Sequence, residues 1–196
     1  MQYTNCMQRI NIENIANVII GYTFRGAILE HKEGALYVIQ ARNITDQLVL
    51  TEQFLTKTKL ETSHTKAFAQ DGDVVISARG SFKSAVLRSS KKIIASSSVY
   101  LLRLKANSQI LPEFLAISLN SSMGQKDIAQ IATGAAIKLM LRKDLEEISM
   151  PVLPLSQQER VIALYQNIKQ QQNLSERRNE LHKNIMNAVF LQLMRS

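Results

Sequence analysis

Cysteine is almost absent from this sequence, which has Cys6 alone among 196 residues. A single cysteine cannot form an internal disulfide bond, so the chain carries no disulfide framework and suits a reducing compartment. Apolar runs such as residues 74–76 are far too short to cross a bilayer, and residues 1–9 lack the apolar stretch of a signal peptide. We therefore expect a cytoplasmic protein with no membrane segment.

Aromatic residues are also few, at 6%, and tryptophan is missing. Proteins that bind single-stranded nucleic acid stack successive bases on aromatic side chains, so this scarcity argues against such a binder. Recognition of a duplex uses hydrogen bonds to base edges in the grooves and does not depend on stacking. If the partner is a nucleic acid, the composition favours double-stranded DNA.

Catalytic motifs are missing as well. The sequence has no G-x-G-x-x-G or G-x-x-x-x-G-K-[ST] phosphate loop, no G-x-S-x-G elbow, and no Asn-Pro pair of the kind found in adenine methyltransferases. His31, His64 and His182 lie far apart and show no zinc-ligand spacing with the single cysteine. We predict that the chain is not an enzyme and binds neither metal nor cofactor itself.

Two weaker patterns could be taken for chemistry. Asp71 and Asp73 flank Gly72 and could form a metal corner, but these residue types also favour a turn that leads into a strand, which is the preferred interpretation. His64 lies beside hydroxyl residues, but it lacks the third group that would orient a catalytic base. Neither pattern changes the prediction that the chain is not an enzyme.

Positive charge is what the sequence has in excess, with a net charge of +8 and a pI near 9.7. No Asp or Glu occurs from residue 74 to residue 112, although this stretch is rich in serine. Lysine and arginine neutralise phosphates, and hydroxyl groups bond to phosphate oxygens, so we predict a basic DNA-facing surface here rather than only a solvated rim. The basic residues of the stretch are Arg79, Lys83, Arg88, Lys91, Lys92, Arg103 and Lys105. A second basic patch follows residues 133–136 and consists of Lys138, Arg142 and Lys143.

The order of strand-forming and helix-forming segments predicts an α+β domain. Pro112 at the start of residues 112–119 favours a short helix. Because the strands come in a cluster with helices at the flanks, a clustered β-sheet fits better than a doubly wound parallel sheet. Segments rich in strand-forming residues are 36–41, 74–77, 84–87, 92–95 and 98–102.

A single long helix follows the domain. The pattern Ser156 to Glu159 is a capping box, in which Ser156 would accept from the Glu159 amide and start the helix just after Pro154. Neither proline nor glycine interrupts residues 156–194, so the helix would extend on the order of 57 Å. We therefore divide the chain into a globular domain at residues 1–154 and a spacer helix at residues 155–196.

Apolar residues on this helix recur mostly at intervals of three, four or seven, close to the spacing of a coiled-coil seam. The central part, residues 169–180, is polar except for Leu174. A helix this long extends beyond a single small core, so packing against another helix is favoured over folding back on its own domain. The residues expected in a helix–helix contact are Val161, Leu164, Ile168, Leu174, Leu181, Ile185 and Val189.

Several segments, in this order and spacing, resemble the specificity subunits of type I restriction–modification enzymes. Residues 72–81 are similar to the most recognisable run of the family, a Gly-Asp-apolar-apolar strand followed by Arg-Gly. Residues 150–162 resemble the Pro-apolar-Pro-apolar-x-x-Gln segment that opens its long helix. The other matching segments are residues 15–25, 37–44, 111–115 and 133–137.

The resemblance implies a subunit that binds double-stranded DNA and directs other subunits to it. Family members commonly carry two recognition domains and two helices that pair antiparallel, so this chain would be a half-length form that dimerises through its helix. Two identical domains would then bind a bipartite, palindromic target. Methyltransferase subunits with S-adenosylmethionine and restriction subunits with ATP are the implied partners. The residues expected to contact DNA are Tyr22, Thr23, Arg25, Arg42, Asn43, Arg79, Ser81, Lys83, Lys138 and Arg142.

Two other functions remain open at this point. One is a basic coiled-coil scaffold or regulator whose domain binds a protein, which would show no sequence preference on DNA. The other is a small DNA-acting enzyme such as a nuclease, which the missing metal-ligand cluster makes less favoured.

Overall fold

The computed structural model describes residues 8–59, 66–134 and 137–194. The chain divides into two compact units, Met1–Gln158 and Glu159–Ser196. Cys6, His64 and residues 135–136, on which some of the sequence predictions fall, lie outside the described residues.

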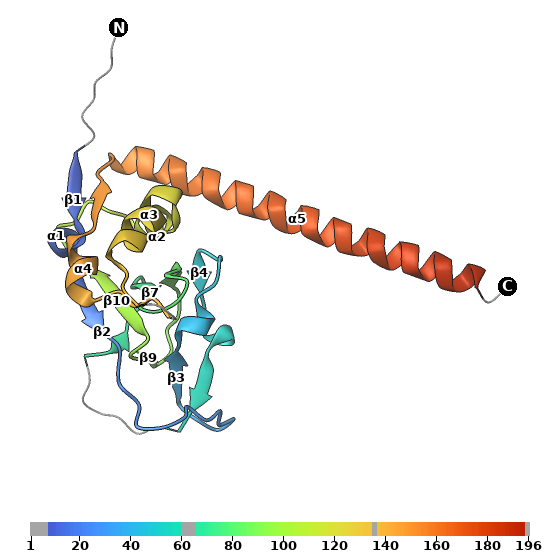
Figure 1. Ribbon diagram of the computed structural model, residues 1–196, viewed down its shortest axis with the longest axis horizontal. Coiled ribbons are helices and arrows are strands. Elements are labelled where there is room, and N and C mark those ends of the chain that lie inside the picture. The colour runs from blue at the N-terminus through green and yellow to red at the C-terminus, as the bar shows by residue number, and fades with distance from the viewer. Residues whose placement is uncertain (1–7, 60–65, 135–136, 195–196) are drawn as a thin grey trace, which may run out of the picture. The chain divides into compact units, whose positions relative to one another are not determined.

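Strands in the first unit form two larger sheets and a small two-stranded one (Figure 1). In the five-stranded sheet the order is β2-β10-β7-β8-β4, and all pairs are antiparallel except β4 with β8. The four-stranded sheet has the order β5-β3-β9-β6, with β3 and β9 parallel. The strands of the first sheet are β2 Ala16–Ile20, β4 Val49–Leu50, β7 Val74–Ser77, β8 Ser84–Leu87 and β10 Val99–Leu104. Those of the second are β3 Leu36–Ile39, β5 Thr56–Thr58, β6 Phe68–Ala69 and β9 Ile93–Ala95.

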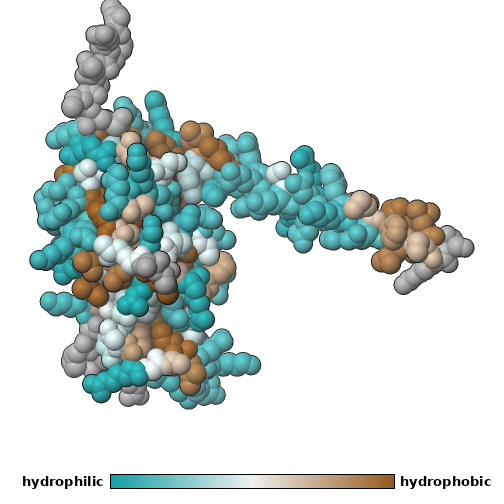
Figure 2. Space-filling model, viewed as in Figure 1, coloured by the Kyte–Doolittle hydropathy of each residue, from teal (hydrophilic) through white to brown (hydrophobic). Residues whose placement is uncertain are grey.

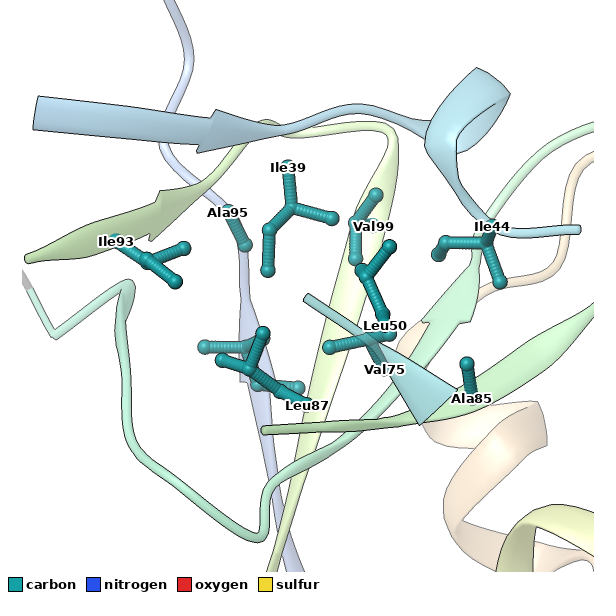
Figure 3. Packing of buried hydrophobic residues seen from close by; sticks show 10 residues of the cluster. Ile39, Ile44, Leu50, Val75, Ala85, Leu87, Ile93, Ala95 and Val99 are labelled. Atoms are coloured by element: carbon teal, nitrogen blue, oxygen red, sulfur yellow. The ribbon is translucent and has the colours of Figure 1, made fainter. Parts of the chain in front are cut away.

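The main hydrophobic core lies between the two sheets (Figure 3). Ile39 and Ile93 come from the four-stranded sheet, and Val75, Leu87 and Leu101 come from the five-stranded sheet, all at most 1% exposed. Alternate residues of β3 and β9 point the other way, into a second cluster covered by residues 22–28. Because both faces of β3 and β9 are covered, these strands are apolar throughout.

Helices cover the other side of the five-stranded sheet. Helix α2, which extends over Pro112–Asn120, packs on β7 and β8, and the Ser84 hydroxyl donates to the Ala116 carbonyl at 3.0 Å. The Asn120 amide donates to the Ser84 carbonyl at 2.7 Å, so the end of α2 is fixed to the start of β8. The remaining elements are α1 Ile12–Ile15, α3 Ser122–Ile131, α4 Arg142–Glu147, the 3-10 turns η1 Ala41–Asn43 and η2 Glu52–Phe54, and the β1 Arg9–Asn11 and β11 Ser149–Pro151 pair.

The structure confirms the α+β fold with a clustered set of strands and a long C-terminal helix. Each predicted strand segment is found, although the strands divide between two sheets rather than forming one. The short strands β4, β5 and β6 were not predicted, because two or three residues are too few to show a period.

The last helix, α5, extends from Leu155 to Leu193 (Figure 1). The predicted capping box is wrong: the helix starts one residue early, and the Pro154 carbonyl already accepts from the Gln158 amide at 3.1 Å. Gln158 is fully buried instead, and its side chain accepts from the Leu111 amide at 2.8 Å. It also donates at 2.7 Å to the carbonyls of Gln109 and Leu153. This glutamine therefore fixes the first turn of α5 to the globular unit.

Candidate nucleic-acid interface

The basic stretch at residues 74–112 is largely paired with groups from outside it. Arg103 makes a forked pair with buried Asp73, with N–O distances of 2.8 and 2.9 Å. Lys83 lies 2.8 Å from an Asp46 carboxylate oxygen. The sequence showed no sign of these ion pairs, because a run without acids in sequence is not a surface without acids. The expectation that the stretch faces DNA stays a prediction.

Arg88 belongs to the same paired set. It contacts Asp71 at 3.3 Å and donates to Glu113 on α2. Burial works against its charge, but the bonds to Glu113 and Asp71 outweigh burial and raise the pKa of Arg88. The hydrogen bonds that Arg103 donates to Asp73 likewise raise the pKa of Arg103. Both arginines hold the unit together.

The Asp71–Gly72–Asp73 pattern is a turn, as the preferred interpretation predicted. Gly72 has a φ of 85°. Asp73 accepts from the Gln70 amide at 2.8 Å, and Asp71 accepts from the Ser89 amide at 3.0 Å. Among the described residues, no group of three or more His, Cys, Asp or Glu side chains could hold a metal ion.

Two loops are joined into one surface that we call the basic loop pair, residues 78–83 and 137–142. The Gly80 amide donates to the Lys138 carbonyl at 3.1 Å, and the Met140 amide donates to the Ala78 carbonyl at 3.0 Å. Arg79 and Leu139 form an antiparallel bridge. Segments almost sixty residues apart in sequence thus support each other.

Backbone conformation fixes the tip of the first loop. Gly80 has a φ of 82°, and Phe82 has a φ of 49°, a region that residues with a Cβ rarely adopt. The Phe82 side chain is buried, so packing holds the loop in this conformation. Backbone strain of this kind tends to persist at functional sites.

Cations of the basic loop pair are presented to solvent. Arg79, Ser81 and Lys138 are exposed, and the described residues give Arg79 and Lys138 no ion pair. Arg142 donates to Glu146 at 2.7 Å but stays half-exposed. The structure therefore brings together four exposed residues expected to contact DNA, and Lys83, which is paired with Asp46, lies at the end of the first loop.

Tyr100 lies beneath this surface. Its hydroxyl donates to the Met140 carbonyl at 2.9 Å. Burial raises the pKa of Tyr100, and the positive charges of Arg79 and Arg142 act against that rise. The tyrosine thus supports the second loop from inside the fold.

A second group of expected DNA contacts consists of Arg42, Asn43 and Lys83. Asn43 uses its side chain internally, accepting from the Gln40 amide at 2.8 Å and donating to the Phe54 carbonyl at 2.6 Å. Arg42 is exposed and donates to the Thr56 hydroxyl at 3.3 Å. Asn43 therefore shapes this region, while Arg42 is available at its surface.

The third group is Tyr22, Thr23 and Arg25. The backbone of Tyr22 bonds to residues 95 and 97, and its ring packs edge-on against Phe24 with centroids 5.0 Å apart. Thr23 and Arg25 are exposed. Tyr22 therefore packs in the second hydrophobic cluster, and the two residues near it are open to solvent.

Apolar residues of α5 are the remaining predicted contacts. Val161 is half-buried, whereas the other six residues expected in a helix–helix contact, Leu164, Ile168, Leu174, Leu181, Ile185 and Val189, are 46–63% exposed. Apolar side chains gather most densely over the last turns of the helix, as Figure 2 shows. No helix among the described residues is long and apolar enough to cross a membrane.

Sequence reasoning missed the apolar residues exposed next to the second group. Val49 is 37% exposed and Phe54 is 46% exposed. Their exposure depends on how the 3-10 turns place them, which short irregular segments do not reveal in sequence.

Comparison with known proteins gives one family and several structures. The family model for the type I restriction modification DNA specificity domain matches residues 7–184. No curated protein matches the chain.

Solved structures share the fold at low sequence identity. An HsdS subunit from Thermoanaerobacter tengcongensis is 18% identical with a TM-score of 0.59, covering 87% of this chain and 39% of its own. The S subunit of a type I restriction-modification system from M. genitalium is 15% identical with a TM-score of 0.59, covering 90% and 43%. A chain from a structure on complex assembly and conformational transition of the type I R-M system is 17% identical with a TM-score of 0.63, covering 87% and 40%. The present chain thus spans about two fifths of these chains.

Proposed function

The chain belongs to the family of type I restriction modification DNA specificity domains, and on this premise we propose that it binds a specific sequence of double-stranded DNA. In this role it directs methyltransferase and restriction subunits to the target and catalyses nothing itself. S-adenosylmethionine would bind to the methyltransferase subunits and ATP to the restriction subunits. The cytoplasmic location stays a prediction.

The basic loop pair is the observation that carries the proposal. Arg79 and Lys138 project from two loops that are hydrogen-bonded to each other, whereas Arg88 and Arg103 are held by carboxylates. An arginine on a preformed loop can place its two-pronged side chain on guanine in the major groove. Lysine and serine beside it can bind phosphate oxygens and fix the position of the domain on the duplex.

Exposed apolar residues on α5 support pairing of two copies through this helix. A helix with an exposed apolar stripe gains stability when a second helix covers the stripe. We propose an antiparallel homodimer in which each domain binds one half of a gapped, palindromic target. The polar centre at residues 169–180 would fix the register of the two helices.

Selection of bound sequences from a random duplex library tests the proposal, with the full chain alone and with a candidate methyltransferase subunit. Enrichment of a gapped palindrome is the expected result. Binding that has no sequence preference and only weakens as salt rises would instead favour a basic scaffold that binds proteins.

Arg79→Ala then tests the basic loop pair on the selected duplex. We expect specific binding to weaken by about 1–3 kcal/mol, with relaxed preference at one base pair. Arg160→Ala on α5 is the matched control, because it removes the same charge from an exposed position outside both the loops and the polar centre of the helix. Equal affinities of the Arg79→Ala variant and the unchanged protein would remove Arg79 from the interface.

A further inference from the structure

A small pocket opens between β8 and the segment that carries η1, β4 and η2. Its volume is about 200 Å³. Leu50 and Ala85 form a buried apolar floor, and Val49 and Phe54 form partly exposed apolar walls. Burying apolar surface is favourable, so side chains left open in such a pocket suit an apolar ligand face.

The pocket is held open by internal hydrogen bonds. The Asn43 side chain joins the Gln40 amide at 2.8 Å to the Phe54 carbonyl at 2.6 Å, so the two 3-10 turns are fixed relative to each other. The parallel pairing of β4 with β8 fixes Leu50 opposite Leu87. A preformed pocket binds its ligand without the entropic cost of ordering loops.

Polar side chains line the opening of the pocket. Thr45 and Gln47 are exposed and offer a hydroxyl and an amide, and Arg42 adds a positive charge. The ion pair between Lys83 and Asp46 connects this rim to the basic loop pair. A ligand with an apolar face, a polar edge and a nearby negative charge would match the apolar walls, the polar rim and the positive charge of the pocket.

Size narrows the choice of ligand. Pockets for drug-sized molecules and cofactors have volumes of about 300–1,000 Å³, so this one suits a single planar ring rather than a whole cofactor. We propose that the pocket accepts one unstacked base of the DNA target. The inference rests on the proposed function and adds a step to it: the duplex is distorted, not only contacted along its grooves.

In the bound state the base packs its face against Phe54 and Val49. Its hydrogen-bonding edge points to Thr45 and Gln47, and Arg42 lies near its phosphate. Stacking on an aromatic ring offsets part of the cost of leaving the duplex stack. One such ring is enough for a single base, which agrees with the low aromatic content.

2-Aminopurine placed in turn at each position of the selected duplex tests the proposal, because its fluorescence rises when the base unstacks. We expect a rise at one position with the full chain alone, because a methyltransferase subunit flips its own target base and would add a second rise. Val49→Trp, which fills the pocket from a partly exposed position, should abolish that rise and weaken specific binding by about tenfold. Phe54→Ala should weaken binding similarly, and circular dichroism checks that both variants fold.

Ile20→Trp is the matched control, since Ile20 is 50% exposed on β2 and does not line the pocket. It should change neither fluorescence nor affinity. Sequence-specific binding without any unstacked base, or a rise that survives both pocket variants, would overturn the inference and leave the proposed function intact. Pocket variants that release the methyltransferase subunit but keep full DNA affinity would identify a protein-docking pocket and also overturn it. Absence of any preferred sequence would overturn both the inference and the proposed function.

Discussion

In the first unit, β7, β8 and β9 bury every one of their residues, whereas α5 buries only Gln158 among its described residues. Leu101 on β10 is 0% exposed, and Leu174 on α5 is 62% exposed. The same residue type is therefore part of a complete core in one region and open to water in the other. The difference indicates that the globular unit supplies its own packing, while the helix leaves its apolar side chains uncovered in a single chain.

The largest expected effect comes from adding charge to the helix. Leu181→Glu with Ile185→Glu places two carboxylates in the exposed stripe, so we expect the proposed dimer to be lost completely. Sedimentation velocity measures the association. Unfolding of the globular unit by urea should not change, and a clear loss of its stability would show that the two regions are not independent.

Core truncation should have the next largest effect. Leu101→Ala removes a fully buried side chain and should lower the free energy of unfolding by about 2–5 kcal/mol. Leu174→Ala is the matched control on the helix and should change the stability of the dilute monomer by no more than about 0.5 kcal/mol. Urea denaturation measures the unfolding free energy of both variants. Equal losses would show that the core and the helix do not differ in packing.

Gln158 lies where the two regions join along the chain. Gln158→Ala leaves the Leu111 amide and two carbonyls without a partner, so we expect a loss of about 1–3 kcal/mol in unfolding free energy. Gln157→Ala, at an exposed position, should have no measurable effect. If both variants unfold alike, the buried amide does not fix the start of α5.

The smallest effect concerns pH. Burial raises the pKa of Tyr100 above its ordinary value of 10.0, so the folded state keeps a proton that the unfolded chain releases. This contribution to stability is complete below pH 10 and is lost as the pH rises through the folded pKa. Tyr100→Phe should make the unfolding free energy less dependent on pH above 10, as measured by urea denaturation at several pH values. If the unfolding free energy of the variant depends on pH as in the unchanged protein, groups other than Tyr100 cause that dependence.

Sequence patterns predicted the larger elements well. Residues 74–77 and 84–87 are long enough to show strand-forming composition, and the run without proline or glycine after residue 155 predicts the helix. Charge pairing was predicted poorly. Arg88 and Arg103 were expected to face DNA, but Asp71, Asp73 and Glu113 reach them from outside the acid-free stretch.

The predicted capping box also failed because of contacts between residues that are far apart in sequence. Ser156 and Glu159 have the right spacing for a local cap, yet the start of α5 is decided by Gln158, whose partners include residues 109 and 111. A contact across almost fifty residues leaves no local pattern. The family resemblance of residues 150–162, which include Gln158, could nevertheless be seen in the sequence. A comparison of residue types does not require the hydrogen-bond partners to be known.

By itself, the sequence determined the fold class, the long helix with its apolar residues and the positive net charge, since composition and spacing along the chain govern these properties. Tertiary structure decided which cations remain free. Arg79 and Lys138 come together on paired loops, while Arg88 and Arg103 are neutralised inside the unit. The physical reason is that a charge is screened or paired by whatever lies near it in space, and nearness in space is set by the packing of the two sheets.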